Sequence, residues 1–376
     1  MAFDAVVIGG GLLGTATAYH LVTAGARTLL VDRADPGRAT DAGAGILSPE
    51  TNSRDPEAWF RLAAAAADDY PSLIDRLSGE QGGDTGYARC GKLVVAATED
   101  EVEPFARARG IVFERQRARG APAPADLQEV SAAEARSLFP ALGTVHGAIY
   151  SRVAARVDGR LLNRALRAAA AARGLVVRPG SVERLLMDRG RVTGVLVDAD
   201  RVEAAAVAIA GGAWSESFAG QLGVNIPVAP QRGQIIHLGL AVDTSRWPMV
   251  SAFHHHYLVA WPDRRVVAGA TRETGSGFAP HTTAVGVRDV LDEALRVAPG
   301  LAGAEIREIR VGLRPLTADT LPVLGAVPGV AGVFLATGHG PTGLTLGPYS
   351  GKLVAALMLG KRPEMDLEPY SVTRFA

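Results

Sequence analysis

Cysteine is almost absent from this sequence of 376 residues, because Cys90 is the only one. A lone thiol cannot form a disulfide within the chain, which favours a reducing compartment. Long hydrophobic runs are also lacking, and none reaches the roughly 20 residues that a membrane span needs. Neither Lys nor Arg precedes the first apolar segment, as a secretory signal would require. We therefore expect a cytoplasmic protein without a membrane span.

An excess of charge of either sign is missing as well. Lys and Arg together number 39, and so do Asp and Glu. This balance leaves no electrostatic footprint for nucleic acid or for an anionic membrane. Apolar residues make up 48% and charged residues 21%, which is the composition of a folded soluble protein. The length exceeds one ordinary hydrophobic core, so we expect two domains or one large elaborated domain.

Glycine is plentiful, and its first cluster forms a binding motif. Gly9, Gly11 and Gly14 fit the pattern G-x-G-x-x-G between a predicted strand and a predicted helix. The first glycine permits a tight turn, the second lets the backbone approach a pyrophosphate, and the third lets the helix pack on the strand. Asp32 ends the next predicted strand, where a carboxylate accepts ribose hydroxyls. The pattern predicts a dinucleotide site; the alternative is a glycine-rich turn with an acid there by chance.

A second glycine turn lies near the other end of the chain and favours a flavin. Gly338, Gly340 and Gly343 fall between a predicted strand and a predicted helix. A nicotinamide enzyme has no evident use for a second cradle so late in the chain. A flavin does, because a helix N-terminus stabilises negative charge on the reduced ring. We therefore predict FAD rather than NAD, with an ordinary strand–helix turn as the alternative.

The predicted elements are of two kinds, which suggests two differently built sheets. Strands that alternate with helices are expected at 3–8, 27–32, 175–180 and 332–337, with helices at 15–24, 56–78, 159–174 and 343–359. The helix at 56–78 is expected to break at Pro71. Strands without intervening helices are expected at 91–98, 110–114, 182–212, 234–238, 257–261 and 265–271. The scattered βα elements predict a discontinuous nucleotide domain with an antiparallel sheet inserted into it.

Several motifs together resemble one known family. They are the opening fingerprint, TDAGAGILSPE at 40–50, AGGAWS at 210–215, QRGQIIHL at 231–238, GLRP at 312–315 and ATGHGPTG at 336–343. In this order they resemble the D-amino-acid oxidase/glycine oxidase family of FAD-dependent oxidoreductases. The resemblance implies an α/β fold, with a Rossmann-like FAD domain and an antiparallel substrate domain. We assign residues 1–83, 145–225 and 310–376 to the FAD-binding domain and residues 84–144 and 226–309 to the substrate-binding domain.

The resemblance also implies which residues hold the cofactor. Leu12 and Leu13 offer backbone to the pyrophosphate, and Asp32 and Arg33 hold the adenosine. Family members that attach flavin covalently use a cysteine near the GLRP position, and Cys90 is remote from it in sequence. Non-covalent FAD is therefore expected. The implied cofactor contacts are Gly9, Gly11, Leu12, Leu13, Gly14, Asp32, Arg33, Ala39, Thr40, Ala44, Gly45, Ile46, Val182, Gly212, Trp214, Gly338, His339, Gly340, Pro341, Thr342, Gly343 and Leu344.

Three residues are implied to meet the substrate. Arg314 of GLRP lies in a run with only one anion, Asp319, and by resemblance its guanidinium pairs with a substrate carboxylate. The alternative is a structural arginine that bridges to Asp319 or to backbone carbonyls. Tyr257 and His255 are the implied pocket residues, with solvated histidines as the alternative reading. No metal site is expected, because neighbouring histidines on a strand cannot converge on one ion.

These residues predict an FAD-dependent enzyme that oxidises the C–N bond of a small amino acid to an imine. Glycine oxidases carry an arginine where this sequence has Pro341, so the carboxylate site is less charged than theirs, which argues against glycine as the preferred substrate. A D-amino acid, a glycine-like substrate and a secondary amine such as a proline derivative are the expected substrate classes. The electron acceptor, oxygen or another, and homo-oligomer formation stay open. Two other functions remain: a nicotinamide-dependent dehydrogenase and a non-catalytic flavoprotein or redox sensor.

Overall fold

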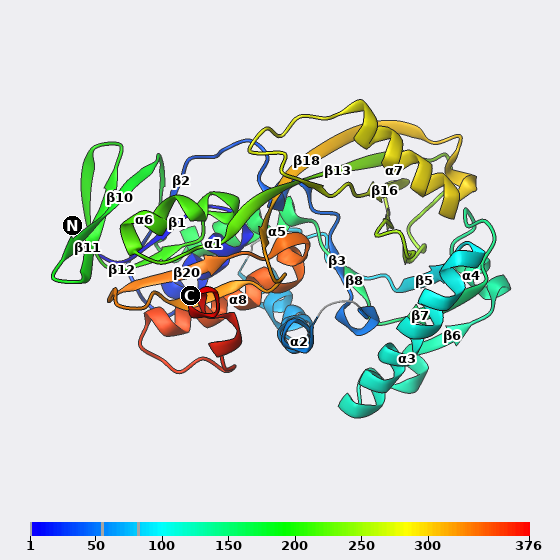
Figure 1. The fold of residues 1–376 in the computed structure, drawn as a ribbon, viewed down its shortest axis with the longest axis horizontal. Coiled ribbons are helices and arrows are strands. Elements are labelled where there is room, and N and C mark those ends of the chain that lie inside the picture. The colour runs from blue at the N-terminus through cyan, green and yellow to red at the C-terminus, as the bar shows by residue number, and fades with distance from the viewer. Residues whose placement is uncertain (1, 54–55, 81–82) are drawn as a thin grey trace.

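Two large sheets organise the molecule (Figure 1). The computed structural model describes residues 2–53, 56–80 and 83–376. Within these residues one sheet has eight strands, a second has nine, and a small third sheet has three. The α/β fold class predicted from the sequence is thus confirmed. The division of the chain into domains with stated boundaries remains a prediction.

The eight-stranded sheet carries the nucleotide motif. Its central strands run parallel, in the order β12-β1-β2-β9, with β20 on the far side of β12, while β10, β11 and β19 pair antiparallel. Parallel strands of this kind are buried on both faces, and β1 and β2 read as nearly continuous apolar runs. The strands are β1 (Phe3–Ile8), β2 (Thr28–Asp32), β9 (Val176–Pro179), β10 (Val182–Asp188), β11 (Arg191–Val197), β12 (Asp200–Ile209), β19 (Val323–Ala326) and β20 (Val333–Thr337).

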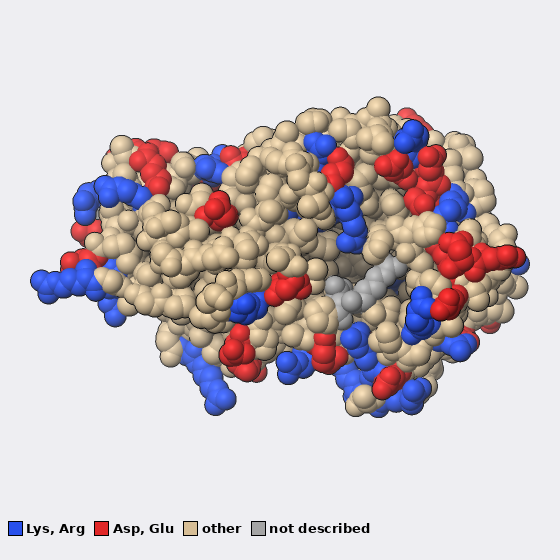
Figure 2. Space-filling model, viewed as in Figure 1, with Lys and Arg blue, Asp and Glu red and all other residues tan. Residues whose placement is uncertain are grey.

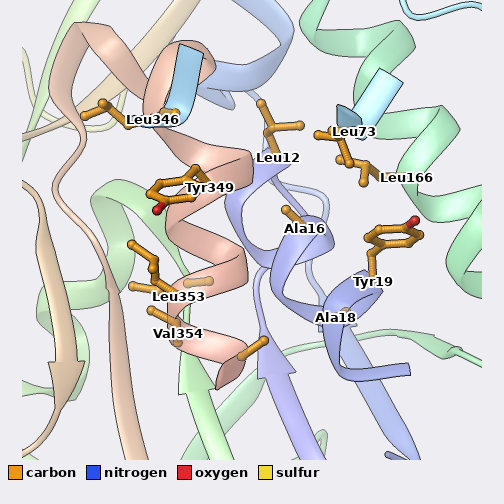
Figure 3. Close-up of a cluster of buried hydrophobic side chains, with 14 of the residues drawn as sticks. Leu12, Ala16, Ala18, Tyr19, Leu73, Leu166, Leu346, Tyr349, Leu353 and Val354 are labelled. Atoms are coloured by element: carbon orange, nitrogen blue, oxygen red, sulfur yellow. The ribbon is translucent and has the colours of Figure 1, made fainter. Parts of the chain in front are cut away.

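Helices pack against this sheet and around the first helix. Leu12, Ala16 and Tyr19 of α1 lie between side chains of α8 and those of α5 and α2 (Figure 3). The α1–α8 contact is close, because a Cβ on Gly351 would lie 2.8 Å from the backbone nitrogen of Thr17. This packing fixes the N-terminus of α1 over the end of β1. The helices are α1 (Leu12–Thr23), α2 (Glu57–Gly79), α5 (Gly159–Ala171), α6 (Ala219–Leu222) and α8 (Gly343–Met358).

The nine-stranded sheet is mostly antiparallel, with the order β17-β13-β16-β15-β14-β5-β7-β6 and β18 paired along β13. The two long strands β13 and β18 reach from the centre of the molecule into this second half (Figure 1). Their register sets Gln231 opposite Arg314. The strands are β5 (Lys92–Ala96), β6 (Leu127–Val130), β7 (Gly147–Ser151), β13 (Val228–Gly239), β14 (Met249–Ser251), β15 (Tyr257–Trp261), β16 (Arg265–Gly269), β17 (Glu273–Thr274) and β18 (Glu305–Thr317).

The remaining elements join the two halves or cover the second sheet. Helix α7 packs on the nine-stranded sheet through Val290, Ala294 and Val297. The small sheet pairs strands that are far apart in sequence, in the order β3-β8-β4. These elements are β3 (Ile46–Leu47), β4 (Ala88–Arg89), β8 (Ala155–Arg156), α3 (Val102–Arg119), α4 (Ala132–Leu138) and α7 (Ala284–Val297).

Two secondary-structure predictions are wrong. Residues 110–114 were expected as a strand, but they belong to helix α3. Phe105, Ala108 and Val112 share its buried face at helical spacing, and a five-residue window around GIVFE misses that period. Pro71 does not break α2 either. Tyr70 and Leu73 on both sides of the proline are buried in the core, so tertiary packing outweighs the local cost.

Charges of both signs are mixed on the face that Figure 2 shows, without an extended area of one sign. No helix in the described residues is long and apolar enough to span a membrane.

Candidate active site

The predicted dinucleotide motif forms a tight cradle between β1 and α1. Gly9 has φ +106°, a conformation that L side chains rarely adopt. A Cβ on Gly14 would lie 2.0 Å from the carbonyl oxygen of Gly9, so only glycine permits this approach of helix to strand. Gly11 caps α1, and the first turn of the helix contains no acidic residue. The backbone N–H groups and the positive end of the helix dipole therefore face an open pocket.

Asp32 stands at the end of β2 beside the cradle, with two arginines around it. Arg38 Nη1 lies 3.0 Å from Asp32 Oδ2, and Arg167 Nη2 lies 3.8 Å from the same oxygen. A Cβ on Gly10 would lie 2.7 Å from that oxygen, so the carboxylate borders the glycine turn. Arg33 and Asp35 form an ion pair at the pocket edge. Sequence reasoning missed Arg38, whose approach depends on the path of the loop after β2.

The second glycine turn leads from β20 into α8 on another wall of the pocket. Gly338 and Gly340 have positive φ angles of +77° and +49°. His339 is buried, and its Nε2 lies 3.0 Å from Ser350 Oγ. Burial lowers the pKa of His339 to about 4, so its imidazole is neutral at ordinary pH. With Pro341 beside it, this turn presents no positively charged side chain to the pocket.

Arg314 lies on β18 with its guanidinium at the pocket wall. Its Nη1 donates to the carbonyl oxygen of Thr271 at 2.8 Å and to Gln231 Oε1 at 3.3 Å. Within residues 2–53, 56–80 and 83–376 it forms no ion pair with a carboxylate. Asp319, the anion nearest in sequence, pairs with Arg374 at 2.7 Å. Burial lowers the pKa of Arg314 below its usual value, and the nearby Tyr257 and Glu273 only partly oppose this decrease.

Tyr257 and His255 also line this end of the pocket, but they come from different local structures. Tyr257 begins β15, whereas His255 lies in the preceding turn with φ +67°. Burial raises the pKa of Tyr257, and the neighbouring Arg314 partly offsets that rise. His254 turns away toward Glu293, with Nδ1 and Oε1 3.1 Å apart. The structure thus brings both predicted residues to the pocket, Tyr257 from a strand and His255 from the turn before it.

Two glycines that the sequence did not single out make room for these side chains. A Cβ on Gly233 would lie 2.3 Å from Arg314 Nη2, inside the space of the guanidinium. A Cβ on Gly269 would lie 2.8 Å from the hydroxyl of Tyr257. Gly233 stands opposite Gly312 in the β13–β18 ladder. Gly233 belongs to the QRGQIIHL motif, but the sequence does not show which side chain needs the space that it leaves. The pairing of β13 with β18 shows that this side chain is Arg314.

One continuous pocket contains most of the predicted site residues. It runs from the glycine cradle and Asp32 to Arg314 and Tyr257. Gly14, Gly338 and Thr342 do not line it. Gly14 serves helix packing, Gly338 packs against Thr317, and Thr342 accepts a hydrogen bond from Trp59 at 3.2 Å. The predicted residues that line it are Gly9, Gly11, Leu12, Leu13, Asp32, Arg33, Ala39, Thr40, Ala44, Gly45, Ile46, Val182, Gly212, Trp214, His255, Tyr257, His339, Gly340, Pro341, Gly343, Leu344 and Arg314.

The cradle, the second glycine turn and the antiparallel sheet define a flavin-dependent oxidoreductase, and comparisons with known proteins agree. The model of the DAO family, FAD dependent oxidoreductase, matches residues 4–357. The chain belongs to this family. FAD is therefore the cofactor, and the nicotinamide alternative is set aside. The open cradle between β1 and α1 and the carboxylate of Asp32 beside it fit this group.

Three relatives illustrate the similarity. "Uncharacterized oxidoreductase YurR" of Bacillus subtilis (strain 168) is 41% identical over 370 residues, with 97% of each chain covered. The glycine oxidase of Pseudomonas aeruginosa is 34% identical over 375 residues, with 99% of each chain covered. The crystal structure of iminodiacetate oxidase from Chelativorans sp. BNC1 matches with a TM-score of 0.92 and 40% identity over 98% of each chain.

Proposed function

We propose that this protein oxidises the C–N bond of a small amino acid to an imine. The observation that carries the proposal is Arg314, a guanidinium at the pocket wall without a carboxylate partner in the described part of the chain. A substrate carboxylate would supply the missing anion. The similar glycine oxidase and iminodiacetate oxidase bear names of amine-oxidising enzymes whose substrates carry carboxylates. These names support the same reaction class here.

The residues of the chain would bind and orient the substrate. Arg314 presents a planar fork that holds a carboxylate in one orientation. The hydroxyl of Tyr257 beside it would share that carboxylate, and His255 would border the amine side. FAD, when bound, would supply the hydride acceptor, so that loss of a hydride from carbon and of a proton from nitrogen would convert the amine to an imine. Positioning of this kind accounts for most of the rate that such residues can contribute.

The cofactor would be held by the two glycine turns. The N–H groups at the start of α1, together with the hydroxyl of Thr40, would meet the pyrophosphate, and Asp32 would accept the ribose hydroxyls. Thr40 already accepts a hydrogen bond from the Leu12 nitrogen at 3.0 Å. The segment from His339 to Leu344 would approach the pyrimidine edge of the flavin, where the N-terminus of α8 favours negative charge. Residues 1–83, 145–225 and 310–376 would form this cofactor domain.

We further propose that FAD is held without a covalent bond. Cys90 is remote from GLRP in sequence, but in space it packs in one apolar cluster with Ile46 and Tyr257. It does not line the pocket, and burial raises the pKa of its thiol, which disfavours the thiolate. Acid denaturation should therefore release all the flavin into the supernatant. Yellow colour retained in the washed protein pellet would contradict this expectation.

An anaerobic substrate screen tests the proposed reaction. Glycine, sarcosine, proline, iminodiacetate and pairs of D- and L-amino acids are mixed with the oxidised holoenzyme, and the flavin absorbance near 450 nm is followed. Bleaching by at least one amino acid supports the proposal, and re-exposure to air then tells an oxidase from a dehydrogenase. If no amino acid bleaches the flavin while dithionite does, the result supports the alternative, a non-catalytic flavoprotein or redox sensor.

Tyr257→Phe should raise KM more than it lowers kcat. The proposed hydroxyl binds the carboxylate and transfers no proton, so its loss costs about 10- to 150-fold in KM for one hydrogen bond to a charged group. Flavin content should be unchanged. Tyr150→Phe is the matched control, because Tyr150 lies on β7 and does not line the pocket. A large fall in the rate of anaerobic flavin reduction with an unchanged KM would instead give Tyr257 a chemical role.

A further inference from the structure

A second arginine, Arg272, lines the same end of the pocket as Arg314. It follows Thr271, whose carbonyl oxygen accepts the 2.8 Å hydrogen bond from Arg314 Nη1, so the two arginines leave adjacent stretches of backbone. The side chain of Arg272 is exposed, and it makes no hydrogen bond or ion pair with any described residue. The carboxylate site proposed above does not use it. Its position therefore needs a separate explanation.

The acidic residue next to Arg272 in sequence cannot balance its charge. Glu273 is engaged by another arginine, with 2.6 Å between its Oε2 and Arg232 Nη2. Its other oxygen accepts hydrogen bonds from Gln234 at 2.6 Å and from the hydroxyl of Thr271 at 2.7 Å. Glu273 is thus satisfied by its own neighbours. Arg272 remains available to a ligand.

Acidic side chains are also lacking at the end of the pocket that Arg314, Arg272 and Tyr257 line, which we call the substrate end. Among the described residues that line it, the carboxylates are those of Asp32 and Asp35. Asp32 ends β2 and Asp35 follows it, beside the glycine cradle, where they pair with Arg38 and Arg33, respectively. Near Tyr257 the pocket is therefore lined by two guanidinium groups and by no described carboxylate. A ligand with a single carboxylate would neutralise only one of them.

The charges of the two arginines act on the same groups. Burial is the main cause that lowers the pKa of Arg314, and the positive charge of Arg272 lowers it further. Burial raises the pKa of Tyr257, while Arg314 and then Arg272 counteract that rise. The charge of Arg272 thus affects both proposed substrate-binding groups, Arg314 and Tyr257. An anion placed between the arginines would relieve their mutual repulsion.

We propose that Arg272 binds a second carboxylate, so that the preferred substrates are amines that carry two carboxylates. This inference rests on the proposed function and narrows its substrate class. Such a substrate has one of two forms. In an iminodiacetate-like secondary amine the nitrogen stands between two carboxymethyl groups, whereas in an acidic amino acid such as aspartate both carboxylates are attached through carbon. Either form would satisfy Arg314 with one carboxylate and Arg272 with the other.

The test compares each dicarboxylate with a neutral partner of nearly the same size. Iminodiacetate is paired with its monoamide, and D- and L-aspartate are paired with D- and L-asparagine. For the wild type, kcat/KM should favour one dicarboxylate over its amide by about 10- to 100-fold, the range expected for a hydrogen bond between charged groups. The pair that shows the preference identifies which of the two forms the site takes.

Arg272→Gln should reduce that preference to about 3-fold or less, because glutamine binds an amide as well as a carboxylate. Its kcat/KM for sarcosine and glycine should change less than about 2-fold, since these substrates use only Arg314. Arg288→Gln is the matched control, because Arg288 on α7 is 69% exposed and does not line the pocket. Flavin content and Tm of both variants should equal those of the wild type.

Two results separate the failure of this inference from failure of the proposed function. If sarcosine or glycine bleaches the flavin, but the dicarboxylates show no preference over their amides, the reaction class stands and the role of Arg272 is refuted. The same conclusion follows if Arg272→Gln lowers kcat/KM equally for a dicarboxylate and its amide. If no amine reduces the flavin of the wild type, the proposed function itself fails, and the inference fails with it.

Discussion

Replacement of Arg314 by alanine is expected to lower kcat/KM toward amino acids by about 30- to 700-fold, which corresponds to roughly 2–4 kcal/mol. The loss arises because the substrate carboxylate would enter a pocket wall that no longer offers the planar guanidinium fork of Arg314. Arg314→Lys keeps the charge but not the planar fork, so it should recover only part of the rate. Amines without a carboxylate should show little difference among the three proteins.

The side chain also has structural contacts, and the experiment must separate them. Arg314 donates to Thr271 and Gln231, each bond worth about 0.5–1.5 kcal/mol of stability. A small decrease in Tm is therefore expected, with unchanged flavin content. Gly233→Ala is a useful second variant, since its Cβ would displace the guanidinium without removing the charge. If Arg314→Ala loses flavin or melts far earlier while its active fraction oxidises amino acids normally, the arginine is structural.

Gly14→Ala should nearly abolish FAD retention. The added Cβ would lie 2.0 Å from the carbonyl oxygen of Gly9 and 3.2 Å from Ala210 Cβ, so α1 must move away from β1. Overpacking of this kind costs about 1–3 kcal/mol, and the displaced helix would no longer direct its N–H groups at the pyrophosphate. The ratio of absorbance at 450 nm to that at 280 nm in the purified protein measures retention. A full complement of flavin would show that the cradle tolerates the shift.

Two further variants, one remote from the cradle on α3 and one beside it, tell packing from chemistry. Gly110→Ala is the packing control, because a Cβ there meets nothing within 4 Å. It should retain flavin fully and gain a little stability in its helix.

Asp32→Asn keeps the shape but removes the charge, and should raise the Kd for FAD by about 10- to 100-fold. The Tm of its apoprotein reports separately on the lost ion pair with Arg38. Unchanged FAD affinity would mean that Asp32 does not hold the ribose.

The cofactor half was the more predictable part of this protein. A glycine whose φ is +106°, a helix that starts directly after it and an acid at the next strand end all leave local signatures in sequence. These three features lie within some 30 residues of one another, so glycine spacing and hydrophobic periodicity are enough to predict them. The α/β class, the family and the FAD cofactor could therefore be inferred from the sequence alone.

Long-range packing limited the rest of the sequence prediction. Residues 110–114 look like a strand when read alone, and the core contacts of Phe105 and Val112 make them helical. The same packing carries α2 through Pro71. The helix and strand propensities of a short segment differ by less free energy than the burial of an apolar face contributes. Tertiary contacts therefore decide which structure the segment adopts.

By itself the sequence determined the nucleotide fingerprint, the family motifs and the presence of an arginine at GLRP. The tertiary structure alone decided what surrounds that arginine. Arg272, Gly233 and Tyr257 come from three separate stretches of chain, and only sheet pairing brings them to Arg314. The structure also assigned Asp319 and Glu273 to other arginines. The reason is physical: a charge interacts with whatever lies within a few ångströms, and sequence distance does not measure that separation.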